Sequence, residues 1–154
     1  MNGENHHLRA IFVLGPSSSG KTTLCEAISE RLGINAQLYI KEIARRVMLT
    51  HGFTRNDTDT FEMQHAIMVS QLAAERAAIA FAESMVRSMP CSGSPPTVLS
   101  DRSAVDPVVY ATTSDAPGAS ERRQRLLNDR AFQDNLTWYR KALFGEYQGQ
   151  LEQG

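Results

Sequence analysis

The chain has 154 residues, which is enough for one domain. Its apolar fraction of 42% and charged fraction of 21% are those of an ordinary globular protein, and its net charge of −1 argues against a nucleic-acid or membrane partner. The two cysteines have no metal-ligand spacing, and we find neither a secretory signal nor an apolar run long enough to span a membrane, so we expect a cytoplasmic protein.

The first part of the chain alternates short apolar runs with helical patterns. Residues 1–7 are polar and are expected to be disordered. The run 8–14 predicts a buried strand, and a helix follows over 21–32. Residues 37–40 predict a second strand, and 42–50 predict a second helix.

A long helix is expected next, capped by Asp59 or Thr60 and reaching about Met89. Its Met and aromatic side chains repeat at helical spacing over a broad face, which indicates core packing rather than a cofactor site. The remaining elements are a flexible connection at 91–96, a strand at 97–100, helices at 104–111 and 121–144, and a loop at 112–119 between these two helices.

Strands that alternate with helices predict an α/β fold, with a parallel sheet covered by helices on both faces. We expect one domain over residues 8–144 and a polar tail over 145–154. Ligands of such sheets bind at the carboxyl ends of the strands, where Gly15 and Asp101 both lie.

The segment between the first strand and the first helix matches the phosphate-loop pattern G-x-x-x-x-G-K-[ST] in full. It reads Gly15-Pro16-Ser17-Ser18-Ser19-Gly20-Lys21-Thr22. Its backbone N–H groups and the helix N-terminus can surround phosphate oxygens, and Lys21 can reach the β- and γ-phosphates. The Thr22 hydroxyl can bind Mg²⁺, while Thr23 supports the start of the helix. The pattern therefore predicts ATP or GTP with Mg²⁺ as ligands, without distinguishing a kinase from an NTPase switch.

Asp101 follows the third strand, at the position of a Walker B acid. Its carboxylate can hold Mg²⁺ through water or accept a proton from an attacking hydroxyl. Arg102 comes next and can bind a phosphate or a carboxylate with two hydrogen bonds. The alternative is a turn at the end of a strand with a surface ion pair.

Glu42 and Arg45 follow the second strand and share one face of a helix. They are either an exposed ion pair or an acid and an anion clamp that bind the acceptor of a phosphoryl group. Gln64 and His65 on the long helix could face the same cleft, although a packed or surface role fits His65 better.

Two further features have ordinary structural interpretations. Cys25, four residues after Lys21, is interpreted as a core residue without redox chemistry. The cluster Arg122, Arg123 and Arg125 lies beside acidic residues and is interpreted as a solvated helix face.

Three stretches together resemble the NadR-like P-loop ATPase/kinase family, an AAA-type domain related to ribosylnicotinamide kinase. They are FVLGPSSSGKTTL at 12–24, IKEIARRVMLTHGFTRND at 40–57 and LSDRSAVDPVVYA at 99–111, and the resemblance covers roughly 10–144. The last stretch is also similar to the Asp-Arg motif of thymidylate kinases and the related motif of deoxynucleoside kinases.

The resemblance implies ATP and Mg²⁺ at 15–22, a catalytic or metal-associated acid at Asp101 with Arg102 beside it, and an acceptor role for Glu42 and Arg45. The implied reaction transfers the γ-phosphoryl group to a hydroxyl of a small nucleoside-like molecule, whose identity is not inherited. An NTP-binding switch acting through a protein partner, or an impaired paralogue, is the alternative.

The end of the chain departs from this family. After YRKALF at 139–144, the family resemblance calls for a further buried strand and a basic lid, whereas this chain continues with GEYQGQLEQG. A lid arginine can contribute about 10³ to 10⁵ in rate. We therefore expect a chain that is truncated, poorly catalytic and only marginally stable.

Overall fold

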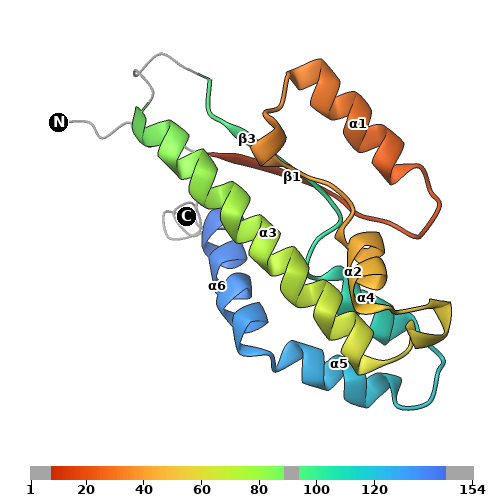
Figure 1. Cartoon of the computed structure of the whole chain (residues 1–154). Coiled ribbons are helices and arrows are strands. Elements are labelled where there is room, and N and C mark those ends of the chain that lie inside the picture. Colours follow the sequence, from red (N-terminus) through yellow and green to blue (C-terminus); the bar gives the residue numbers. More distant parts are fainter. Residues whose placement is uncertain (1–7, 89–93, 145–154) are drawn as a thin grey trace, which may run out of the picture.

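Three parallel strands form the sheet of the computed structural model, which describes residues 8–88 and 94–144 (Figure 1). The strands are β1 (Arg9–Val13), β2 (Tyr39–Ile40) and β3 (Thr97–Asp101), in the order β1-β3-β2. β3 is therefore the central strand. It pairs with β1 from Arg9 opposite Thr97 to Val13 opposite Asp101, and with β2 from Tyr39 opposite Leu99.

The described residues also form six α-helices: α1 (Lys21–Leu32), α2 (Ile43–His51), α3 (Phe61–Ser88), α4 (Asp106–Thr113), α5 (Ala119–Leu127) and α6 (Arg130–Phe144). α1 lies on one side of the sheet, and α3 and α6 lie on the other (Figure 1). Successive side chains of β3 point to opposite faces of the sheet, so Ser100 contacts α3 and Asp101 contacts α1. The expected α/β fold with helices on both faces is confirmed.

Two clusters of buried apolar side chains hold the layers together. One lies between β2, β3, α2 and α3 and includes Ile40, Val47 and Val98. The other joins α3 to α4, α5 and α6 around Leu72 and Phe132. α3 contributes to both clusters, which agrees with the broad apolar face that its sequence predicts.

The boundaries differ from the sequence predictions in two places. Only Tyr39 and Ile40 form a strand, because residues 36–38 make a 3₁₀ turn whose start is capped by the side chain of Asn35. The single helix expected over 121–144 is wrong. The first helix, α5, ends before Asn128. A second helix, α6, then starts, because the Asp129 side chain accepts a hydrogen bond from the Phe132 N–H at 3.0 Å and so caps it.

The α3 and α4 boundaries are close to the predicted ones, and Thr60 caps α3 by accepting from the Met63 N–H at 3.3 Å. The expectations for residues 1–7 and 145–154, and for the first part of the 91–96 connection, fall outside the described residues. Among the helices described, none is both long enough and apolar enough to cross a membrane.

Candidate functional site

The phosphate loop connects the end of β1 to the first residue of α1. Gly15 has φ 149° and Gly20 has φ 84°, both in the left-handed region that favours glycine, so these two positions explain the glycines of the motif. Inside the loop, the Ser19 hydroxyl donates to the Pro16 carbonyl at 2.8 Å. α1 starts without a side-chain cap, which leaves its first N–H groups available to an anion.

Lys21 lies across the inside of this loop. It is only 8% exposed, and its Nζ donates to the Pro16 carbonyl and, at 3.1 Å, to the Ser19 hydroxyl. A cation held by oxygen atoms of the loop can exchange them for phosphate oxygens. The arrangement therefore provides a positive charge where the loop and the helix N-terminus converge.

Thr22 and Asp101 meet across the layer between α1 and β3. The Thr22 hydroxyl donates to Asp101 Oδ2 at 2.6 Å, so the two side chains that the sequence offers as Mg²⁺ ligands lie in contact. Asp101 is 1% exposed, and its Oδ1 has no hydrogen-bond partner among the described residues. An orphaned buried carboxylate oxygen beside a threonine hydroxyl fits the oxygen ligands and bound waters that Mg²⁺ requires.

Arg102 turns from the end of β3 toward the phosphate loop. Its Nη2 donates to the Ser17 hydroxyl at 3.4 Å and its Nη1 to Asp106 Oδ2 at 3.3 Å, while its Nε lies 4.0 Å from Glu42. Burial raises the pKa of Asp106, and the Arg102 guanidinium acts in the opposite direction. Arg102 itself has φ 81°, a strained conformation that costs about 1–3 kcal/mol for a residue with a side chain.

Glu42 lies directly before α2 and joins two cations. Besides Arg102, it contacts Arg45 at 3.8 Å. The Glu42 side chain is 26% exposed, whereas that of Arg45 is 80% exposed. Glu42 is therefore partly enclosed, and Arg45 lies at the rim.

These groups line a single cleft of about 280 Å³ at the carboxyl ends of the strands. The lining residues are Ser17, Ser18, Ser19, Gly20, Lys21, Thr22, Thr23, Glu42, Arg45, Asp101 and Arg102. The structure thus brings the phosphate loop, the acid at the end of β3 and the Glu42–Arg45 pair into one place. Gly15 and Pro16 belong to the loop but are not among the residues that line the cleft.

Gln64 and His65 do not reach this cleft. Gln64 is buried and donates to the Thr58 carbonyl at 2.7 Å. His65 contacts Asp129 at 2.9 Å and stacks on Phe61, in agreement with the packed role favoured for it. Both side chains belong to the packing around the start of α3.

The arginine cluster on α5 also has structural contacts. Arg122 donates to the Pro117 carbonyl at 2.7 Å and its side chain is only 12% exposed, so a solvated face is wrong for this residue. Arg125 lies 3.6 Å from the centre of the Phe61 ring, a cation–π contact. Cys25 is fully buried, as predicted, and burial raises the pKa of its thiol to about 11.

A buried polar cluster behind the cleft was missed by the sequence analysis. It consists of Gln71 and Glu75 of α3 with Asn135 and Tyr139 of α6. Burial raises the pKa of Glu75, although its hydrogen bonds act against this increase. Its only sequence signal is that polar residues occupy positions 71 and 75, within the apolar pattern of a helix.

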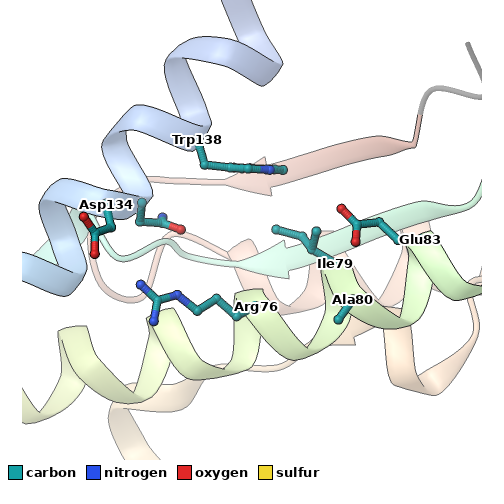
Figure 2. Close-up of a pocket in the computed structure, with 7 residues that line it drawn as sticks. Arg76, Ile79, Ala80, Glu83, Asp134 and Trp138 are labelled. Atoms are coloured by element: carbon teal, nitrogen blue, oxygen red, sulfur yellow. The ribbon is translucent and has the colours of Figure 1, made fainter.

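A second cleft lies between α3 and α6. Figure 2 shows Arg76, Ile79 and Glu83 extending from α3, with Asp134 and Trp138 on α6 opposite them. None of the site residues predicted from the sequence lines it. Its charges are of both signs, so it has no single ligand chemistry.

A comparison with protein-family models matches residues 10–138 to an AAA domain. This segment includes the phosphate loop, β2, β3, all of β1 except Arg9, and every residue of the cleft. Comparisons with curated proteins and with solved structures gave no match.

Proposed function

Because the chain belongs to the AAA-domain family and has a P-loop nucleotide-binding domain, we propose that it transfers the γ-phosphoryl group of ATP to a hydroxyl of a small, nucleoside-like acceptor. The observation that carries this proposal is the shared cleft. It contains a phosphate loop, and beside the loop an acid and two arginines that the loop does not need. GTP is the alternative donor, since we identify no base-reading motif in the sequence.

On the donor side, the loop N–H groups and Lys21 bind the β- and γ-phosphates. Thr22 and Asp101 would hold Mg²⁺, which neutralises charge on the phosphate oxygens when it is bound. The contact of Arg102 with the loop at Ser17 supports a role for its guanidinium in stabilising the transferring phosphoryl group.

On the acceptor side, Glu42 is the other carboxylate that lines the cleft, because Asp101 is assigned with Thr22 to Mg²⁺. Glu42 accepts the hydroxyl proton while the acceptor oxygen attacks the γ-phosphorus. The bond from this phosphorus to the bridging oxygen breaks, and ADP leaves with its electron pair. Arg45, exposed at the rim, binds an anionic or polar group of the acceptor.

The test is ADP formation from ATP and Mg²⁺ with a panel of nucleosides and nucleoside monophosphates. Glu42→Gln should lower kcat/KM for the acceptor by about 10²-fold or more, as expected for loss of a general base, with the nucleotide Kd nearly unchanged. Glu26→Gln is the matched control, because Glu26 is an exposed glutamate on α1.

Two results would contradict this proposal. If Glu42→Gln turns over as fast as the parent, Glu42 and Arg45 are an ordinary surface ion pair. Such a pair contributes about 0–1 kcal/mol to stability. Tight nucleotide binding with no transfer to any acceptor would instead favour an NTP-binding switch.

A further inference from the structure

Two side chains of α3 contact the end of β3 and the backbone that follows it. The Gln71 side-chain amide donates to the Ser100 hydroxyl at 3.0 Å and to the Arg102 carbonyl at 3.4 Å. Glu75 Oε1 accepts from the Ala104 N–H at 3.1 Å and from the Gln71 amide at the same distance. Asp101 therefore lies within a segment that α3 holds at both ends.

Both side chains are in the interior, where polar groups are costly unless their hydrogen bonds are made. Gln71 is 2% exposed and Glu75 is fully buried. The second carboxylate oxygen, Glu75 Oε2, accepts from Tyr139 and, at 3.4 Å, from Asn135. One oxygen of Glu75 thus holds the segment after β3 and the other holds α6.

Arg102 is the residue in this segment that needs such support. Its φ of 81° is rarely adopted by a residue with a side chain. Its own N–H donates to the Val13 carbonyl at 3.1 Å, at the end of β1. The strained residue is therefore held by β1 through its N–H and by α3 through its carbonyl and the nearby Ala104 N–H.

We propose that Gln71 and Glu75 are positioning residues, which hold Asp101 beside Thr22 and turn Arg102 toward the phosphate loop. This inference rests on the proposed function, because it assigns the pair a role in Mg²⁺-dependent nucleotide binding. A solely structural pair would contribute to stability without affecting how strongly Mg²⁺ enhances that binding.

The experiment compares Gln71→Leu, Glu75→Leu and Glu75→Gln with the control Tyr139→Phe. Gln71→Leu removes the bonds toward Ser100 and Arg102 and leaves Tyr139 and Asn135 paired. Glu75→Gln keeps an oxygen for the Ala104 N–H and should rescue what Glu75→Leu loses. Tyr139→Phe disturbs the same buried cluster on the side of α6 only.

The first readout needs no nucleotide. Amide hydrogen exchange, measured by NMR, should accelerate at least tenfold at Arg102 and Ala104 in Gln71→Leu, with Leu99 in the middle of β3 unchanged. In Tyr139→Phe, the exchange rates of Arg102 and Ala104 relative to that of Leu99 should be the same as in the parent. Equal exchange in Gln71→Leu and the parent would overturn the inference.

The second readout is the ratio of the ATP Kd in EDTA to that in Mg²⁺, measured by calorimetry. This ratio should fall about tenfold in Gln71→Leu and Glu75→Leu, and should stay near the parent value in Glu75→Gln and Tyr139→Phe. An unchanged ratio in a folded Gln71→Leu protein would also overturn the inference. A parent that binds no nucleotide would refute the proposed function instead, and the exchange data would still decide whether α3 holds the segment.

Discussion

Replacing Lys21 with alanine tests the nucleotide site most directly. In the structure Lys21 is nearly enclosed, and among the described residues its ammonium group bonds to oxygen atoms of its own loop. A phosphate would take the place of these oxygens and add the attraction of opposite charges. The substitution removes this attraction, while Gly15 and Gly20 still allow the loop to adopt the same backbone conformation.

The size of the effect follows from the kind of bond that is lost. A hydrogen bond to a charged group contributes about 1.5–3 kcal/mol. Since about 1.4 kcal/mol corresponds to a factor of ten, the Kd for ATP with Mg²⁺ should rise about 10- to 100-fold in Lys21→Ala. Lys21 is 8% exposed and hydrogen-bonded, so the free energy of unfolding without nucleotide should also fall, by about 0.5–3 kcal/mol, the usual range for a single substitution.

Isothermal calorimetry measures this affinity, and Arg31→Ala is the matched control. Arg31 is exposed in the last turn of the same helix, so its loss removes one positive charge far from the phosphate loop. A Lys21→Ala protein that binds ATP as tightly as the parent would show that Lys21 does not contact the phosphates. Equal weakening by Arg31→Ala would also contradict this role, since net charge alone would then explain the effect.

Three further predictions concern buried side chains. The raised pKa of Glu75 means that the folded protein retains a proton that the unfolded chain releases, so the free energy of unfolding should fall as pH rises above about 4.5. In Glu75→Gln the free energy of unfolding should not fall in this way. The Tm of the variant should therefore rise relative to that of the parent between pH 4 and pH 8. Phe132→Ala should lower the free energy of unfolding in urea by about 3–5 kcal/mol, against about 0.5 kcal/mol for the exposed Leu49→Ala; similar losses would contradict the core assignment. Cys25 should resist iodoacetamide at pH 8 until the protein unfolds, and peptide mapping separates it from Cys91; rapid labelling of native protein would refute its burial.

The parts of this protein that the sequence predicted well are those with a local signal. The phosphate loop is recognised from the spacing of its glycines, and the end of β3 from the change from an apolar run to Asp101. Both signals depend on a few consecutive residues, so no knowledge of distant contacts is needed. The same holds for the start of α3, where Thr60 caps the helix.

The errors arose where a local pattern was weaker than a cap or a distant contact. The helix expected over 121–144 breaks because Asp129 caps a new helix and contacts His65, which is far away in the sequence. The role of Glu75 was missed because its partners on α6, Asn135 and Tyr139, lie 60 and 64 residues further along the chain. Only the packing of α6 against α3 reveals that this carboxylate is buried.

The position of β3 in the centre of the sheet also has a consequence for how the protein is made. Arg9 pairs with Thr97 and Tyr39 pairs with Leu99, while the described residues show no pairing between β1 and β2. Neither outer strand can therefore pair until β3 has left the ribosome. Bringing β1 and β2 to β3 closes long loops of chain, which costs entropy before any pairing is gained. A nascent chain that stops before Thr97 can form helices, but its phosphate loop has neither a sheet beneath it nor Asp101 beside Thr22.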